Sequence, residues 1–297
     1  MRVLITGGAG FIGSHAATLL TEKGASVCVF DSLVSGKRER VPARANFIQG
    51  DIRDRAALDA AMKGVTHVVH LAALVSVPES VRHPEETFAV NVEGTQNVFA
   101  AAHAAGAQQV VYASSAAVYG DAPELPKRED MALAPQSPYA ESKVQNESDA
   151  VRMAAKGFSL MGLRFFNVYG PGQSADHAYA SVVPRFIKEA RAGQPLPLTG
   201  DGSQTRDFIH VSDVARAIAA ALESDANGVC NIASGDATRI SELIDLIRAA
   251  YPVEVQVLPP RPGDILHSVA DISRAKEVLH WSPTVSFPDG IRELLSV

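Results

Sequence analysis

Gly7-Gly8-Ala9-Gly10-Phe11-Ile12-Gly13 stands near the start of the chain, between an apolar run at residues 2–6 and a helical pattern at 12–23. Gly7 can take the positive φ of a tight turn, Gly10 lets a phosphate approach the backbone, and Gly13 lets the helix pack close to the strand. The helix offers free N–H groups and the positive end of its dipole to that phosphate. This order of strand, turn and helix predicts a dinucleotide site; the alternative is a glycine-rich turn without a ligand.

Short β-like runs alternate with helical stretches through the first half of the chain. The runs are apolar throughout, which is typical of strands in a parallel sheet that is covered on both faces. They lie at residues 2–6, 25–31, 46–49, 67–71 and 109–114, with helical patterns between them such as 53–63 and 84–106. The alternation predicts an α/β fold with a doubly wound parallel sheet.

The composition changes after Tyr169-Gly-Pro-Gly172, where prolines and glycines cluster at residues 184–202 and again at 259–263. We expect these clusters to be loops of a smaller C-terminal lobe that binds the substrate. A helix from Tyr139 to about 156 and a strand at 159–167 complete the first domain. The predicted division is residues 1–170 for the dinucleotide-binding domain, with 208–235 returning to it as a helix at 211–223 and a strand at 228–233. Residues 171–207 and 236–297 then form the lobe.

The composition excludes several classes of partner. The 297 residues include 27 basic and 33 acidic ones, a formal net charge of −6, which disfavours nucleic acid and anionic membranes as partners. No apolar run of about 18 residues predicts a membrane span, and the first glycines come too early for a signal peptide. Cys28 and Cys230 lie in strand-like runs, so we expect buried free thiols and a cytoplasmic protein.

Asp31 ends the second β-like run, eighteen residues after Gly13. A carboxylate there accepts both ribose hydroxyls of an adenosine and repels a 2′-phosphate, which favours NAD over NADP. Lys37 and Arg38 follow closely and would temper this preference, unless they are solvated loop charges.

Tyr139-Ala-Glu-Ser-Lys143 places a phenol and an ammonium on one helix face, one turn apart. We expect the ammonium to favour the phenolate and to lower the pKa of the tyrosine, giving a base that works near neutral pH. By itself the pair could be incidental on a surface helix, but here it follows the fifth β-like run. Ser114 and Ser115 end that run, either as functional hydroxyls or simply as the end of a strand.

These motifs together resemble the extended short-chain dehydrogenases that act on sugar nucleotides, the NAD-dependent epimerase/dehydratase family, and the resemblance covers nearly the whole chain. It implies a Rossmann fold, bound NAD, and Tyr139, Lys143 and Ser115 as the catalytic residues, with the Ser115 hydroxyl on the reacting oxygen. The cofactor-binding residues that it implies, besides Tyr139 and Lys143, are Gly7, Gly10, Phe11, Ile12, Gly13, Asp31, Ser35, Gly36, Asp51, Ile52, Leu71, Ala72, Ala73, Asn91, Ser114 and Phe166.

Three of these segments have distinct implied roles. Asp51-Ile52 resembles an adenine clamp, with the carboxylate on the exocyclic amine, although Asp51 could instead cap a helix that begins there. Leu71-Ala-Ala73 resembles the segment that passes under the cofactor, and Asn91 resembles the asparagine that braces it.

The resemblance also implies a substrate site made by Ser76, Ser115, Tyr139, Asn167, Val182, Arg206, Arg261, Asp264 and Ser268. Arg206 and Arg261 would hold the diphosphate, which needs charge-assisted partners in an acidic protein; either alone could be a surface salt bridge. Ser268 matches a gatekeeper beside the C2 substituent of the sugar, and its small size predicts room for an N-acetyl group. The alternative is that Ser268 only lines a loop.

The implied reaction is epimerisation at C4 of a UDP-hexose, UDP-glucose or UDP-galactose and possible N-acetylated forms, through a 4-keto sugar. Related dehydratases and decarboxylases carry an acidic residue close after the Ser115 position, where this chain has Ala116 and Ala117. A ketoreductase that releases its cofactor and a nucleotide-sensing module remain as alternatives, although such sensors commonly lack the Tyr/Lys pair. The resemblance further implies a homodimer through helix 84–106 and the Tyr139 helix. We expect no metal site, because His177, His210 and His267 show no ligand spacing.

Overall fold

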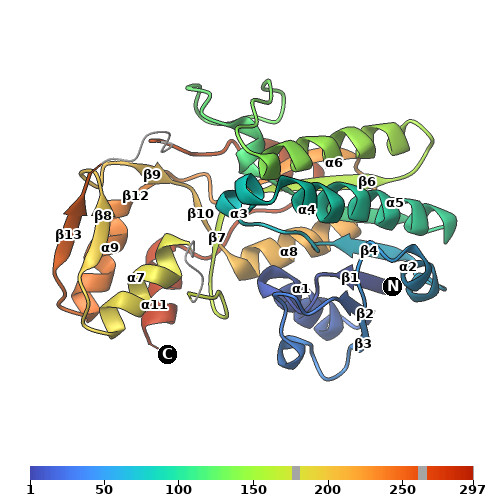
Figure 1. The fold of residues 1–297 in the computed structure, drawn as a ribbon, viewed down its shortest axis with the longest axis horizontal. Coiled ribbons are helices and arrows are strands. Elements are labelled where there is room, and N and C mark those ends of the chain that lie inside the picture. Colours follow the sequence, from blue (N-terminus) through green and yellow to red (C-terminus); the bar gives the residue numbers. More distant parts are fainter. Residues whose placement is uncertain (176–180, 260–265, 297) are drawn as a thin grey trace.

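The main sheet has seven strands, all parallel, in the order β11-β6-β5-β4-β1-β2-β3. A computed structural model describes residues 1–175, 181–259 and 266–296 of the chain (Figure 1). The strands are β1 (Arg2–Thr6), β2 (Ser26–Asp31), β3 (Asn46–Gln49), β4 (His67–His70), β5 (Gln109–Ser115), β6 (Leu160–Phe165) and β11 (Gly228–Ile232). The strand order reverses between β1 and β4, so the doubly wound parallel sheet predicted from the sequence is confirmed.

Helices cover both faces of this sheet (Figure 1). Val3 and Ile5 of β1 face a core shared with α1 (Phe11–Glu22), α8 (Val211–Leu222) and α10 (Ser273–Val278). Leu4 faces the opposite core, which includes residues of α2 (Arg55–Ala61), α5 (Gly94–Ala104) and α6 (Pro138–Ala154). Because successive side chains of a strand point to opposite faces, only a strand that is apolar throughout can fill both cores.

A single helix was expected at residues 84–106, but its middle is not α-helical. The chain there forms α4 (Pro84–Phe88), a π-helical turn η2 (Ala89–Glu93) and then α5. The wider turn contains Asn91, whose side chain is fully buried and bonded to the neighbouring Leu74. Single π-helical turns inside α-helices are frequent at functional sites. The periodicity of apolar residues does not predict them.

Another short helix, α3 (Val77–Arg82), was not predicted. Its N-cap is Ser76, whose hydroxyl accepts a hydrogen bond from the Glu79 amide at 3.3 Å, and Pro78 stands in its first turn. A serine followed three residues later by a glutamate is a signature of a helix N-terminus, so this signal was present in the sequence.

The C-terminal part of the chain forms a smaller group of elements with its own apolar core, which includes Val183, Phe186, Leu243 and Ile291. Its elements are α7 (Val182–Arg191), α9 (Ile240–Ala250), α11 (Phe287–Leu295) and the parallel pair β8 (Leu196–Thr199) and β13 (Val255–Leu258). Two further pairs are β7 (Asn167–Tyr169) with β10 (Phe208–His210), and β9 (Thr205–Arg206) with β12 (Thr238–Arg239). The strand expected at 159–167 therefore ends at Phe165 and continues as β7.

Loops throughout residues 184–202 were expected, and this expectation is wrong, because α7 and β8 lie there. Pro184 occupies the first turn of α7, where a missing N–H costs no intrahelical bond. Gly193 follows the end of α7 with a φ of 66°, the usual left-handed ending of a helix. Here proline and glycine mark the ends of elements rather than a loop.

Two remaining expectations concern the whole chain. Among the described residues, no helix has the length and apolarity that crossing a bilayer requires. Cys230 is a buried free thiol, as predicted, whereas Cys28 is free but only half-buried.

Candidate active site

A cavity of about 1420 Å³ runs along the carboxyl ends of β1, β2, β4, β5 and β6 and under the smaller lobe. It includes the point where the strand order reverses, which is where open α/β sheets bind their ligands. A single drug-sized ligand needs about 300–1,000 Å³, so this cavity has room for a dinucleotide and a second ligand.

The glycine turn forms one end of the cavity. Gly7 has a φ of 73°, and a methyl group on it would lie 2.6 Å from the Ala72 amide nitrogen. A methyl group on Gly13 would lie 2.2 Å from the Gly7 carbonyl oxygen. On Gly10 it would meet only that same oxygen, at 3.2 Å. Gly7 and Gly13 are therefore needed for the turn itself, whereas a methyl group on Gly10 would make one tight contact and meet nothing else within 4 Å.

Helix α1 begins immediately after Gly10 and has neither a capping side chain nor an acidic residue in its first turn. Its first N–H groups and the positive end of its dipole therefore face the cavity without an internal partner from a side chain. Together with the sparse surroundings of Gly10, this arrangement fits the pyrophosphate of a dinucleotide.

Asp31 lies at the end of β2, buried beside the turn. One carboxylate oxygen accepts the Ala9 amide at 2.9 Å and the other accepts the Leu33 amide at 2.8 Å. Ser35 lines the cavity. Gly36 does not line it and instead packs directly against the Asp31 carboxylate. The donors fix the orientation of Asp31 and leave lone pairs for ribose hydroxyls.

Of the basic residues that follow Asp31, Arg40 lines the cavity, whereas Lys37 and Arg38 do not. Lys37 and Arg38 are exposed and are absent from the cavity wall, and the Arg38 guanidinium lies 4.5 Å from the centre of the Phe47 ring. Neither side chain therefore sits where it would offset the repulsion between Asp31 and a 2′-phosphate.

Asp51 and Ile52 line the cavity beyond β3. The Asp51 carboxylate accepts bonds from the backbone and the guanidinium of Arg53, which holds the pKa of Asp51 below its usual value. The alternative that Asp51 caps the following helix is wrong, because Asp54 is the N-cap of α2 and accepts the Ala57 amide at 3.0 Å. Asp51 would have to share its carboxylate between Arg53 and an adenine amine.

Leu71, Ala72 and Ala73 form the floor of the cavity after β4, and Asn91 supports the residue that follows them. The Asn91 carboxamide accepts the Leu74 amide at 2.8 Å and donates to the Leu74 carbonyl at 2.9 Å. Asn91 does not line the cavity, since it is fully buried behind this segment. The geometry matches a brace rather than a ligand contact.

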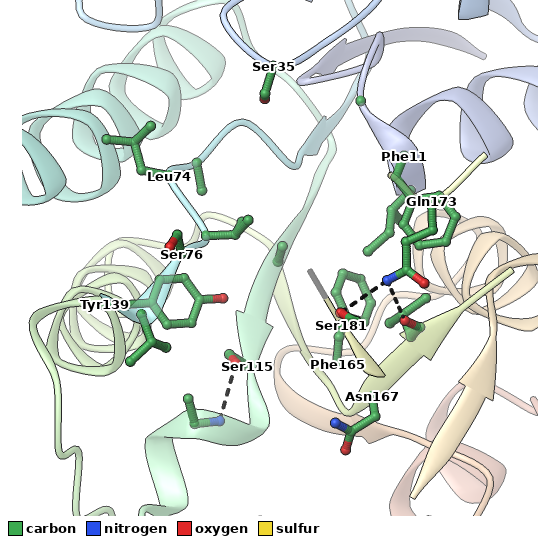
Figure 2. A pocket seen from close by; sticks show the side chains of 18 of the residues that line it. Phe11, Ser35, Leu74, Ser76, Ser115, Tyr139, Phe165, Asn167, Gln173 and Ser181 are labelled. Carbon is green, nitrogen blue, oxygen red and sulfur yellow. Dashed lines mark hydrogen bonds between the residues drawn. The ribbon is translucent and has the colours of Figure 1, made fainter. Parts of the chain in front are cut away.

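Tyr139, Lys143 and Ser115 all line the cavity, and Figure 2 shows Tyr139 and Ser115 near each other in it. Tyr139 stands in the first turn of α6, which Ser137 caps by accepting the Ala140 amide at 3.2 Å. Its ring points from α6 toward Ser115 at the end of β5 (Figure 2). The Lys143 ammonium lies 5.8 Å from the centre of the Tyr139 ring and donates to the Ala113 carbonyl at 3.0 Å.

The electrostatics of this group differ from the expectation. Burial raises the pKa of Tyr139, and the Ser115 hydroxyl only partly offsets the effect. Burial also lowers the pKa of Lys143 to about 8, against an opposing effect of Glu147. The predicted lowering of the Tyr139 pKa by the Lys143 ammonium is therefore wrong for the protein without a ligand, because desolvation of the phenolate outweighs an ammonium that is directed at a carbonyl.

The partner of Ser114 was not predicted from the sequence. Its hydroxyl donates to Glu147 at 2.6 Å, and Glu147 also accepts two bonds from the buried Arg164, at 2.9 and 2.7 Å. Glu147 follows Lys143 by four residues and so lies on the same helix face, which is the signal that could have found it. Ser114 thus lines the cavity with its hydroxyl already engaged.

The substrate end of the cavity is lined by Ser76, Phe166, Asn167, Val182, Arg206 and Ser268. Arg261 and Asp264 lie outside the described residues. Next to Ser115, Ala116 and Ala117 begin a 3₁₀ turn, η3 (Ala116–Tyr119), and bring no carboxylate to this wall. No group of three or more His, Cys, Asp or Glu side chains arranged for a metal ion is found in the described part of the chain.

Gln173 also lines the cavity, and it was not predicted from the sequence. Its amide nitrogen donates to the Val168 carbonyl at 3.1 Å and to the Ser181 hydroxyl at 3.3 Å, which connects β7 to the start of α7 (Figure 2). Its amide oxygen is buried and, within the described residues, accepts no hydrogen bond. Gln173 lines the cavity opposite α6, with Phe11 beside it in the same view (Figure 2).

Comparison with known proteins agrees with this geometry. A UDP-glucose 4-epimerase of Mycolicibacterium smegmatis is 39% identical over 303 residues, which covers 98% of this chain and 96% of that protein. A UDP-N-acetylglucosamine 4-epimerase from Methanobrevibacter ruminantium, solved with UDP-N-acetylmuramic acid, superposes with a TM-score of 0.96 at 37% identity, covering 99% of this chain and 97% of that one. The Thermus thermophilus UDP-glucose 4-epimerase, solved with NAD, gives 0.91 at 39% identity, covering 100% and 98%. Residues 3–233 match the model of the NAD dependent epimerase/dehydratase family, and the chain belongs to that family.

Proposed function

We propose that this protein is an NAD-dependent isomerase that epimerises a UDP-hexose at C4 through a 4-keto sugar. The observation that carries the proposal is the position of Tyr139 and Ser115, which face each other in one cavity between the glycine turn and the substrate lobe (Figure 2). A base and a hydroxyl at this point serve the removal and return of one proton on a substrate oxygen.

The residues of the cavity fit NAD. Gly7, Gly10 and Gly13 with the start of α1 would hold the pyrophosphate, Asp31 the adenosine ribose, and Lys143 the nicotinamide ribose. When bound, NAD supplies a hydride acceptor that can return the hydride to the opposite face of C4.

The protein groups act on the proton. Tyr139 takes the proton of the 4-hydroxyl while Ser115 holds the same oxygen, and Tyr139 gives the proton back when the carbonyl is reduced. Because burial raises the pKa of Tyr139, positive charge must favour its phenolate. Lys143 provides one charge one helical turn away, and an oxidised nicotinamide provides another.

Epimerisation is favoured over elimination or decarboxylation at the same site. Ala116 and Ala117 place no acid or base beside Ser115, so a proton on the carbon next to C4 has no carrier there. We infer that the 4-keto sugar is reduced again rather than released.

The test is turnover of UDP-glucose, UDP-galactose and their N-acetylated forms by the purified protein, with no cofactor added. The proposal expects interconversion at C4 and NAD released on denaturation. Activity only with added NAD or NADH, with a keto or alcohol sugar accumulating, would identify the ketoreductase instead. A 4-keto-6-deoxy sugar or a pentose as product would contradict epimerisation.

We further propose the domain division at 1–170 with 208–235, and 171–207 with 236–297, except that α10 packs into the core of the main sheet. We also propose UDP-galactose as one physiological sugar. A cytoplasmic location would suit the free thiols of Cys28 and Cys230. A homodimer through α5 and α6 is supported by Val151, which is 68% exposed on α6. Sedimentation of the wild type and of Val151→Glu tests the dimer.

A further inference from the structure

Asp207 is a buried carboxylate that the proposed reaction does not use. It stands between β9 and β10 and is fully inaccessible to solvent. One oxygen accepts the Ser234 amide at 2.7 Å and the Ser234 hydroxyl at 2.6 Å. The other accepts the amides of Gly235 at 3.1 Å and Ala270 at 3.0 Å. A carboxylate is the side chain of this size that can accept four such bonds and donate none.

The bonds of Asp207 join three segments that are far apart in sequence. Its own segment carries Arg206 and Phe208, which line the cavity. Ser234 and Gly235 follow β11, at the edge of the main sheet. Ala270 lies two residues after Ser268, which lines the cavity as well. Asp207 therefore connects both cavity-lining segments to the rigid sheet.

Other direct bonds join these segments two at a time. Asn231 of β11 donates to the Asp271 carbonyl at 3.1 Å, and Arg206 of β9 pairs with Thr238 of β12. The Thr205 amide donates to the Leu266 carbonyl at 2.9 Å, and the Thr205 hydroxyl lies 3.2 Å from Nδ1 of His267. The Asn167 amide donates to the Asp207 carbonyl at 3.1 Å, which brings in β7. The side chain of Asp207 differs from these pairwise bonds, because from the Arg206 segment it bonds both the Ser268 segment and the residues that follow β11.

We propose that Asp207 is a positioning residue for the sugar-nucleotide half of the cavity, holding the Arg206 segment and the Ser268 segment in register with the end of β11. The inference rests on the proposed function, because it takes Arg206 and Ser268 as parts of the nucleotide-sugar site. It predicts that the loss of this carboxylate weakens substrate binding and leaves the cofactor half of the cavity unchanged.

The chain offers a matched control in Asp213. Asp213 is also fully buried, and it accepts bonds from the Thr284 amide at 3.1 Å, the Thr284 hydroxyl at 3.0 Å, the Val285 amide at 3.0 Å and the Arg216 guanidinium. It ties α8 to the segment before α11, and none of these residues lines the cavity. Asp213→Asn and Asp207→Asn therefore make the same chemical change at two buried carboxylates that each accept several hydrogen bonds. Asp207 lies beside the cavity, and Asp213 lies away from it.

The experiment measures UDP affinity by calorimetry, KM for the UDP-sugar, NAD content and thermal stability for the wild type and both variants. In Asp207→Asn two of the four donors lose their acceptor, and we expect KM and the Kd of UDP to rise about tenfold or more, with NAD content unchanged. Asp213→Asn should lose stability while its KM and Kd stay at the wild-type values. A Kd and KM in Asp207→Asn no higher than in Asp213→Asn would overturn the proposal.

Ser234→Ala decides the matter if Asp207→Asn does not fold. This variant keeps the carboxylate and removes one of its four donors, so we expect about a threefold rise in the Kd of UDP. An unchanged Kd would count against the positioning role. A wild type that binds UDP but does not epimerise any UDP-hexose would contradict the proposed function, while the comparison of UDP affinities would still test Asp207.

Discussion

The Lys143 ammonium lies one helical turn from Tyr139 and directs its hydrogen bond at the Ala113 carbonyl, 3.0 Å away, rather than at the phenol. Lys143 is buried and Tyr139 is half-buried, and both lie near the end of β5. Burial acts on them in opposite directions, since it raises the pKa of Tyr139 and lowers that of Lys143 to about 8. Because burial disfavours the charged form of both groups, we expect the phenolate of Tyr139 to need a further positive charge from a bound ligand.

Tyr139→Phe tests the proton chemistry directly. We expect turnover to fall by about 10³-fold or more, because phenylalanine fills the same space without the hydroxyl. NAD content should not change, since the glycine turn and Asp31 provide most of the contacts with the cofactor. Coupled activity and the absorbance of released NAD measure the two quantities. Wild-type turnover in this variant would remove Tyr139 from the mechanism.

Lys143→Ala should lower both the rate and the affinity for NAD. The ammonium favours the phenolate, and it also has hydrogens left to bond the nicotinamide ribose. The measurement is the Kd of NAD together with kcat at saturating NAD. An unchanged Kd would leave Lys143 with an electrostatic role only.

Gly10→Ala and Gly13→Ala separate binding from folding in the glycine turn. At Gly13 the added methyl group meets the Gly7 carbonyl at 2.2 Å, so we expect a loss of several kcal/mol, roughly 2–4, in the free energy of unfolding. At Gly10, where φ is −77°, the methyl group meets only the Gly7 carbonyl at 3.2 Å. This single contact is tight but far longer than the contact at Gly13, so Gly10→Ala should lose much less Tm than Gly13→Ala and should lose NAD affinity. Equal Tm losses in both would contradict this account.

The environment of His70 makes the free energy of unfolding depend on pH. It is buried in a chain of bonds, with Nδ1 at 2.7 Å from the Thr6 hydroxyl and Nε2 at 2.8 Å from the Thr95 hydroxyl, and burial lowers its pKa to about 3. The unfolded chain binds a proton near pH 6.5, so the contribution of neutral His70 is complete above that pH and is lost as the pH falls toward 3. The slope approaches about 1.4 kcal/mol per pH unit within this window.

His70→Asn is the comparison that isolates this residue. Denaturation of both proteins at several pH values between 7.5 and 4 should show the wild-type advantage shrinking as the pH falls. Parallel curves for the two proteins would mean that His70 does not titrate on unfolding.

Local spacing in the sequence predicted the parts of the site that local structure determines. Gly7 and Gly13 are specified by the turn they make, Asp31 by the end of its strand, and Tyr139 with Lys143 by one helical turn. Each of these signals lies within a few residues of chain, so periodicity and motif spacing predict it.

The remaining parts depend on contacts between distant residues. Asn91, in its π turn, bonds to Leu74, and Ser114 bonds to Glu147, which lies thirty-three residues further along the chain. Asp207 bonds to Ser234 and Ala270. The raised pKa of Tyr139 could not be predicted either. It follows from burial by distant parts of the chain, which the spacing of Tyr139 and Lys143 does not indicate.

Ser268→Tyr tests which sugars fit. Ser268 is half-buried and lines the cavity, and its segment is bonded to Thr205 through Leu266 and to Asp207 through Ala270. A residue held in this way cannot move aside for a larger substrate, so the size of its side chain should set the limit on the C2 substituent. With serine we expect turnover of UDP-N-acetylglucosamine or its C4 epimer as well as of UDP-glucose or UDP-galactose. With tyrosine the N-acetylated sugars should lose about 100-fold or more in kcat/KM, whereas the unsubstituted hexoses keep most of theirs. Ser268→Thr controls for the substitution itself and should keep both activities. Equal loss on both kinds of sugar, or a wild type inactive on N-acetylated sugars, would contradict a gatekeeper at this position.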